Sequence, residues 1–219
     1  MLKKHFRTLL ITAIVILSPI LVGVTLWDQL PAELPIHWDT NWEVDGYCTK
    51  PMAVFGFPFL LLVLHFFTVC VTTADPKHKN HSHKMLSLVF WIIPVISLVA
   101  SSVTYFAALG KSALAEVIVP VFLGALFLCI GNYLPKCKQN YTVGIKLPWT
   151  LNDEENWNKT HRLAGWVWVI GGIIIVLVGL LRHLWLILAV LIIITLIPTV
   201  YSYILHRKKI RKGRGDTNG

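Results

Sequence analysis

The chain has 219 residues, of which 55% are hydrophobic and 14% are charged, and its formal net charge is +9 at pH 7. Soluble domains carry about 25% charged residues, so this composition excludes an ordinary soluble globular protein. The charged residues are also clustered, which leaves long uncharged runs between them. We therefore expect an integral membrane protein.

Six apolar runs are long enough to cross a membrane, because about 20 helical residues span a hydrocarbon core of ~30 Å. They cover residues 8–27, 51–74, 85–110, 117–134, 163–181 and 184–205. The first run is too long for the core of a signal peptide, and bulky Leu26 and Trp27 stand where cleavage needs small residues. The sequence predicts an all-α bundle of six transmembrane helices, with the first helix retained.

Lys and Arg are concentrated on one side of these spans. If the N-terminus is inside, the outer segments hold only Lys50, Lys111 and Arg182, and all other Lys and Arg residues lie in inner segments. Loops rich in Lys and Arg stay in the cytoplasm, so both termini are predicted to be cytoplasmic. We expect this basic face, with the tail at 206–219, to contact the lipid bilayer, where each basic residue near an anionic surface contributes ~1 kcal/mol of attraction. We expect no direct nucleic acid binding.

The predicted outer loop, residues 28–50, holds five acidic residues and one lysine. Pro31 and Pro35 favour extended or turning chain, Asp45-Gly46 predicts a turn, and the alternation of Ile36 and Trp38 indicates a short strand. We expect an ordered loop over the outer helix ends, attractive to a cationic or amphipathic ligand. A metal site is a weaker alternative, because the spacing matches no metal motif; its ligands would be His37, Asp39, Glu43 and Asp45.

The predicted inner loop, residues 135–162, is the longest polar and aromatic segment between two spans. Pro135 ends the fourth helix, and Asn152 with Glu155 resembles a capping box. We therefore predict an interfacial helix that begins at Asn152 and places Trp157, His161 and Gly165 in one row. Two interpretations remain open: an aromatic anchor at the membrane surface, or a partner-docking or ligand site that uses His161 and Arg162.

Other candidate chemistry is sparse. His65 is the one titratable group in the second span, and we favour a hydrogen bond between helices over a functional role. Glu116 lies near the outer end of the fourth span. The cysteines, at positions 48, 70, 129 and 137, form no CxxC pair, so neither a zinc site nor a disulfide framework is indicated. No catalytic constellation is visible, and we expect neither enzymatic activity nor a cofactor.

Both loops resemble signatures of the SdpI family of membrane proteins. LPAELPIHWDTNWEVDGYCTK is similar to the outer-loop pattern of the DUF1648-type domain near the N-terminus of these proteins, although Trp42 stands where a glycine is usual. GNYLPKCKQNYTVGIKLPWTLNDEENWNKTHRLAGWVWVIGG is similar to the C-terminal signature of the family. The resemblance divides the chain into residues 1–74, residues 75–205 and the basic tail.

The resemblance implies a bacterial plasma-membrane immunity protein that protects its producer against a secreted, membrane-active toxin peptide. It also implies a second role, in which the toxin-engaged protein holds a cytoplasmic autorepressor at the membrane. The implied toxin-facing residues are His37, Trp38, Asp39, Asp45, Gly46 and Lys50. The implied repressor-docking or switch residues are Asn132, Pro135, Asn140, Gly144, Pro148, Trp149, Trp157, Thr160, His161 and Arg162. The alternatives are a small transporter and, less favoured, a metal-assisted membrane enzyme.

Overall fold

The computed structural model describes the backbone of residues 2–215 and the side chains of residues 5–212. Its six long apolar helices confirm the six predicted spans. They are α1 (Leu2–Thr25), α2 (Phe57–Thr73), α3 (His83–Ala108), α4 (Ala115–Tyr133), α6 (Glu154–Leu180) and α7 (Leu184–Gly215). A π-helical turn, η1 (Met52–Gly56), continues directly into α2, and α5 (Pro148–Leu151) is a single turn before α6.

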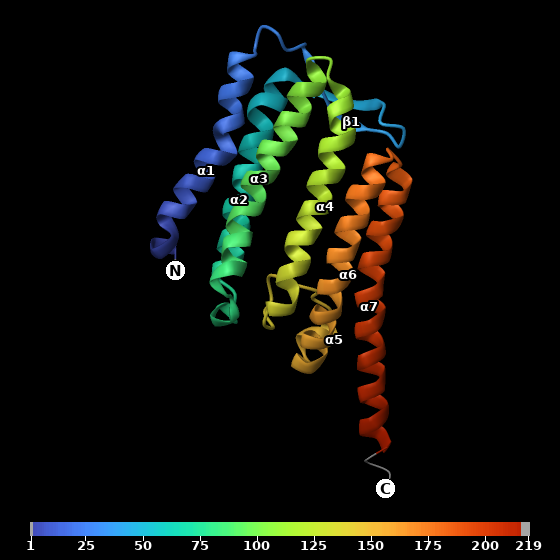
Figure 1. The fold of residues 1–219 in the computed structure, drawn as a ribbon. Helices are drawn as coiled ribbons and strands as arrows, with labels where there is room; N and C mark the ends of the chain where they lie inside the picture. Colours follow the sequence, from blue (N-terminus) through green and yellow to red (C-terminus); the bar gives the residue numbers. More distant parts are fainter. Residues whose placement is uncertain (1, 216–219) are drawn as a thin grey trace.

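The two ends of the bundle differ in structure (Figure 1). One end carries a β-hairpin, β1 (Glu33–Trp38) and β2 (Val44–Thr49), which lies across the helix ends. The opposite end carries the long loops, with the short 3-10 turns η2 (His78–Asn80) and η4 (Leu134–Lys136). We call these the hairpin end and the loop end. The start of α1 and the end of α7 both lie toward the loop end, where α7 projects beyond the other helices.

The helices pack as two groups of three. Helix α3 packs against α1 and α2, whereas α6 packs closely against α4 and α7. The two groups meet along α3 and α4, which are connected through the turn η3 (Ser112–Leu114) at the hairpin end. We call this contact the seam. The predicted division of the chain at residue 74 follows the family signatures rather than this packing, and it stays a prediction.

Glycines at seven-residue spacing bring α4 and α6 close together. They are Gly124 and Gly131 on α4 and Gly165, Gly172 and Gly179 on α6. A Cβ atom on Gly172 would lie 2.6 Å from the carbonyl oxygen of Gly124, and one on Gly165 would lie 2.9 Å from that of Gly131. Small residues allow helices to approach closely in a membrane, where packing replaces the hydrophobic driving force. The predicted close approach at Gly165 is therefore confirmed.

Polar side chains connect α1 to its neighbours inside the bundle. Pro19 has no N–H for the carbonyl of Val15, and the Ser18 hydroxyl donates to that carbonyl instead, at 2.8 Å. The Tyr105 hydroxyl of α3 donates to the Pro19 carbonyl at 3.1 Å. The Ser18 bond satisfies the carbonyl that the proline leaves without a helical partner, and the Tyr105 bond joins α3 to α1 at the same place.

His65 joins α2 to α1, which confirms the predicted hydrogen bond between helices. Its Nε2 lies 2.9 Å from the hydroxyl oxygen of Thr12. The Thr12 hydroxyl also lies within hydrogen-bond distance of the Thr8 and Leu9 carbonyls, at 2.9 and 3.1 Å. Both side chains are fully buried. A neutral ring with one such bond accounts for a histidine inside a span.

The predicted start of the helix after the inner loop is wrong by one residue. The N-cap of α6 is Asp153, whose carboxylate accepts from the backbone N–H groups of Glu155 and Asn156 at 3.1 and 3.2 Å. Asn152 instead follows the end of α5, and its side chain donates to the carbonyl of Pro148, the first residue of α5, at 2.9 Å. Helix α6 then runs without a break, so the segment predicted as a separate interfacial helix forms its first turns.

Candidate functional site

The hairpin confirms the predicted ordered loop and short strand. It adds a second strand that contains Asp45 and Gly46, so the turn predicted there is wrong and the chain turns at residues 39–43 instead. Strands β1 and β2 are antiparallel, with an irregular register around His37, which pairs with Gly46. His37 Nδ1 bonds to the Asp45 carboxylate, and the side chains are 71% and 48% exposed, so this pair faces away from the protein. Gly46 has no room for a side chain, because its Cβ would lie 2.7 Å from the Cβ of His37. A glycine at position 46 therefore allows β2 to lie this close to His37.

Asp39 shapes the turn between the strands. Its carboxylate accepts from the backbone N–H groups of Asn41 and Glu43, both at 2.8 Å. Trp42 has a φ of 65°, in the left-handed region that glycine adopts without a steric penalty. This conformation explains why glycine is usual at the corresponding place in the resembling pattern. The Asp39 carboxylate thus stabilises the turn of the hairpin. The left-handed conformation of Trp42 carries a steric penalty.

Lys50 fixes the far end of the hairpin to the first helix. Its Nζ donates to the backbone carbonyl of Trp27 at 2.9 Å and lies 5.1 Å from the centre of the Trp27 ring. The carbonyl belongs to the chain just after α1, where helix carbonyls have no helical partner. Lys50 therefore holds the exit of β2 against the end of α1.

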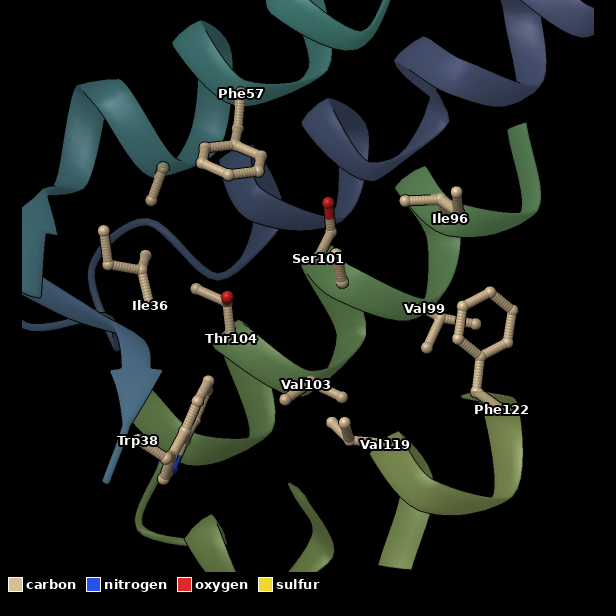
Figure 2. A pocket seen from close by; sticks show the side chains of 12 residues that line it. Ile36, Trp38, Phe57, Ile96, Val99, Ser101, Val103, Thr104, Val119 and Phe122 are labelled. Atoms are coloured by element: carbon tan, nitrogen blue, oxygen red, sulfur yellow. The ribbon is translucent and has the colours of Figure 1, made fainter. Parts of the chain in front are cut away.

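A cavity of about 240 Å³ lies beneath β1, at the hairpin end of the seam (Figure 2). It is partly open and is lined by side chains from β1, from η1 and the start of α2, and from facing turns of α3 and α4. The lining residues are Ile36, Trp38, Ala53, Phe57, Ile96, Val99, Ala100, Ser101, Val103, Thr104, Val119 and Phe122. Except for the hydroxyls of Ser101 and Thr104, the groups that line the cavity are apolar, and Trp38 contributes its ring. Such a cavity suits an apolar group with a few orienting polar contacts.

The tip of the hairpin reaches the second helix group. Thr40 and Asn41 line a hollow together with residues of the turn between α6 and α7, among them Arg182 and Trp185. Arg182 Nη1 also lies 3.0 Å from the Glu116 carboxylate at the start of α4. The hairpin therefore extends from the first helix group to the second.

At the loop end, the predicted row of Trp157, His161 and Gly165 is confirmed, and its aromatic members are buried. The Trp157 and His161 rings stack at 4.0 Å between centres. His161 Nδ1 donates to the Trp157 carbonyl at 2.8 Å, and its Nε2 accepts from the Ile145 backbone N–H at 2.9 Å. Gly144, with a φ of 125°, lies against both rings, and any Cβ there would overlap the imidazole. His161 is therefore a neutral structural histidine that holds the loop.

Asn140 and Thr160 belong to the same buried network. The Asn140 side chain accepts from the backbone N–H of Val143 at 2.7 Å and donates to its carbonyl at 3.0 Å. Thr160 donates to the Asn156 side chain, which donates to the Ser202 carbonyl of α7, each at 2.9 Å. The Trp149 indole donates to the Ser202 hydroxyl at 3.0 Å. Hydrogen bonds therefore join the loop end to α7 and also connect residues within the loop.

The exposed members of the predicted loop-end set are fewer. Asn140, Trp157, Thr160 and His161 are buried, and Gly144 and Trp149 are half-buried. Asn132, Pro135, Pro148 and Arg162 are exposed. A partner that binds the folded loop can contact only the exposed and half-buried residues directly, while the buried residues give the loop its shape.

Asp75, which was not among the predicted residues, links the two helix groups at the loop end. Its buried carboxylate accepts from the backbone N–H groups of Lys77 and Tyr141 at 2.7 and 2.9 Å, and from the Thr142 hydroxyl at 3.0 Å. His81 Nε2 lies 3.3 Å from it. Burial raises the pKa of the Asp75 carboxyl, but these hydrogen bonds outweigh it and hold the pKa below its usual value. An indication was present in the sequence, since Asp75 is the one acidic residue among basic residues 75–84.

The basic part of α7 contacts the start of α6. Lys209 Nζ lies 2.8 Å from the Asp153 carboxylate. This bond is the main reason that the pKa of the Asp153 carboxyl lies below its usual value. Residues 216–219 of the predicted basic tail lie outside the described residues. The described part of the tail continues α7 as a helix that is fixed by one ion pair.

The metal hypothesis gains no geometric support. Across the part of the chain that the structure describes, no group of three or more His, Cys, Asp or Glu side chains is placed to hold an ion. In the hairpin, Asp39 is directed into the turn and His37 bonds to Asp45. Cys48, Cys70, Cys129 and Cys137 are free thiols.

The structure defines a multi-pass helical membrane protein with an ordered hairpin over one end and a bonded loop network at the other. Residues 136–202 match the model of the SdpI/YfhL protein family, and residues 14–62 match a domain of unknown function, DUF1648. The immunity protein SdpI of Bacillus subtilis (strain 168) is 28% identical over 202 residues, which cover 91% of this chain and 96% of that protein. No solved structure gives a significant match. Residues 136–202 are thus similar to the SdpI/YfhL family, and most of the chain is similar to a bacterial immunity protein. The six long apolar helices agree with a multi-pass membrane protein.

Proposed function

We propose that this chain is an immunity protein that protects a bacterium against a secreted, membrane-active toxin peptide. The observation that carries the proposal is the match to an immunity protein over 91% of this chain and 96% of that protein. The two family-model matches cover the hairpin and the loop network. In this proposal both termini and the loop end are cytoplasmic, and the hairpin end faces outward. The Lys and Arg distribution supports this orientation.

The hairpin end is the proposed toxin-facing surface. Its exposed acidic side chains, Asp28, Glu33, Glu43 and Asp45, favour a cationic peptide. Of the basic residues at this end, Lys50 is engaged with Trp27 and Arg182 with Glu116, while Lys111 is exposed in the turn between α3 and α4. Of the predicted toxin-facing residues, the exposed His37 and Asp45 and the cavity-lining Trp38 can touch a ligand. Asp39, Gly46 and Lys50 support the hairpin that presents them.

Survival of a toxin-sensitive bacterium tests this function. The strain would express the full chain or carry an empty vector, and would receive increasing doses of the toxin against which the Bacillus subtilis relative confers immunity. We expect the chain to raise the lethal dose. Equal killing of both strains, with the chain confirmed in the membrane, would contradict the proposal and direct attention to transport.

A second proposed role is signalling, in which the toxin-engaged protein holds a cytoplasmic transcriptional repressor at the membrane. The loop end supports it, because Pro148, Trp149 and Arg162 offer an exposed or half-exposed surface on a rigid base. Signalling requires two states that bind the toxin with different affinity. A fluorescent fusion of the repressor that controls the immunity gene should move to the membrane when toxin is added. Arg162→Ala should reduce this movement without reducing survival, and unchanged movement would contradict the assignment of the docking surface.

A further inference from the structure

We propose that the cavity beneath β1 holds one aromatic or branched aliphatic side chain of a cationic membrane-active peptide. This inference rests on the proposed function, since it names the part of the toxin that the protein recognises and the place where it binds. The peptide backbone would lie outside the cavity, along the acidic hairpin.

The size of the cavity fits one side chain. Its volume is about 240 Å³, whereas an apolar cavity of roughly 150 Å³ already accepts benzene. A phenyl, indole or isobutyl group would therefore enter, and a peptide helix, at about 10 Å across, would not. The occupant is an anchor residue rather than the whole toxin.

The chemistry of the lining fits an apolar group attached to a polar backbone. Ile36, Phe57 and Phe122 supply apolar walls, and the hydroxyls of Ser101 and Thr104 interrupt them (Figure 2). The ring of Trp38 lines the cavity, while its buried Nε1 has no hydrogen-bond partner among the described residues. This nitrogen is closed off from the cavity, so the pocket offers an occupant the ring of Trp38 rather than its N–H.

The charge around the cavity distinguishes a cationic peptide from an anionic phospholipid. The hairpin above it and the chain before it expose Asp28, Glu33, Glu43 and Asp45. Nearby Lys50 is engaged with a backbone carbonyl and with the Trp27 ring. Acidic side chains attract a cationic ligand and repel an anionic headgroup. The site therefore favours the peptide over an acyl chain of an anionic lipid.

The position of the cavity supports the same occupant. It lies on the seam, between α3 of the first helix group and α4 of the second, and directly under the strand that carries His37. Ligand pockets occur preferentially at such interfaces. A peptide bound along the hairpin would thus reach the cavity with one residue.

Two adjacent serines of α3 provide a matched test. Ser101 is buried and lines the cavity, whereas Ser102 is exposed and does not line it. Ser101→Leu fills cavity volume, and Ser102→Leu places the same side chain on the outer surface of the helix. The measurement is the Kd of the fluorescently labelled toxin of the Bacillus subtilis relative for each full-length chain in lipid nanodiscs. We expect Ser101→Leu to weaken binding by about tenfold or more and Ser102→Leu to leave it within about twofold.

The peptide provides the second half of the test. Each large apolar residue of the toxin is replaced in turn by alanine, and one replacement should weaken binding to the natural chain by about tenfold. The same replacement should weaken binding to the Ser101→Leu chain much less, because the cavity is already filled. If Ser101→Leu does not accumulate in the membrane, Ala100→Val fills the same cavity with a smaller addition.

The outcomes separate this inference from the proposed function. Unchanged peptide affinity in the Ser101→Leu and Ala100→Val chains, with protection intact, would overturn the cavity assignment and leave immunity standing. A natural chain that neither binds the toxin nor protects would overturn both. Phospholipid that copurifies with the natural chain but not with Ser101→Leu, at equal peptide affinity, would assign the cavity to lipid and also overturn the proposal.

Discussion

Asp75 determines how the loop end responds to acid. Its pKa lies below its usual value of about 3.9 because, despite burial, it accepts hydrogen bonds from Lys77, Tyr141 and Thr142. A carboxyl with a lowered folded-state pKa stabilises the fold above its unfolded-state pKa, and this stability is lost as the pH falls. We therefore expect the melting temperature to decrease as the pH is lowered below about 4.

Asp75→Asn is the variant that checks this response. It should cost about 1–3 kcal/mol at neutral pH, since backbone donors lose a charged acceptor. It should also remove the corresponding part of the acid dependence. Thermal melts of both chains in one detergent, from pH 7 to pH 3, measure both effects. Parallel curves would show that Asp75 does not carry the acid response.

Gly144 is predicted to be indispensable for the loop network. With a φ of 125° and both the His161 and Trp157 rings against it, Gly144→Ala combines backbone strain of about 1–2 kcal/mol with overpacking of about 1–3 kcal/mol. Gly110→Ala is the control, because Gly110 has a φ of 80° but open space around it. We expect thermal melts to show a large loss for Gly144→Ala and a loss of about 1 kcal/mol for Gly110→Ala. Equal losses would contradict the packing argument.

At the scale of elements, the close pairing of α4 and α6 depends on backbone contact. Gly172→Ala would place a methyl group against the carbonyl of Gly124, which can move only with its helix. Gly171→Ala meets only side-chain atoms of Ile194, which can adjust more easily. We expect Gly172→Ala to lower the melting temperature clearly more than its neighbour does. The reverse order would indicate that α4 and α6 can separate at little cost.

Sequence patterns predicted the elements better than the contacts between them. Long uncharged runs identify the six helices. In the apolar core of a membrane, a chain must satisfy its own backbone hydrogen bonds, and a helix does so within one segment. The alternation of Ile36 and Trp38 indicated β1. The polar sequence of β2 gave no comparable pattern, so the pairing of His37 with Gly46 was not predicted.

The candidate site was predictable to a similar degree. The spacing of Trp157, His161 and Gly165 placed them on one helix face, and their burial against Gly144 depends on a loop whose path no local pattern determines. The contact of Asp75 with Tyr141 joins positions far apart in the chain. Asn152 and Asp153 are both good N-caps, and only the preceding turn α5 decides between them.

At the scale of the whole molecule, the proposed orientation places the hairpin outside the cell. Glu43 lies on the exposed turn of the hairpin, and Lys146 is exposed at the loop end. Glu43→Cys should be labelled by a membrane-impermeant maleimide on intact cells, above the background of the natural cysteines. Lys146→Cys should be labelled only after the cells are permeabilised. Labelling of Lys146→Cys on intact cells would reverse the topology and remove the hairpin from the outer surface.

The central claim is that the outward hairpin end protects the cell by engaging a cationic toxin. Glu33 and Glu43 are exposed on the hairpin, so Glu33→Lys/Glu43→Lys reverses local charge at no cost in buried contacts. Glu154→Lys is an exposed charge reversal at the opposite end.

The most direct measurement is the lethal toxin dose for a sensitive bacterium that carries the natural chain, either variant or an empty vector, at matched membrane abundance. We expect the natural chain and Glu154→Lys to protect, and the hairpin variant to lose most of the protection. Full protection by the hairpin variant, or none by the natural chain, would contradict the account.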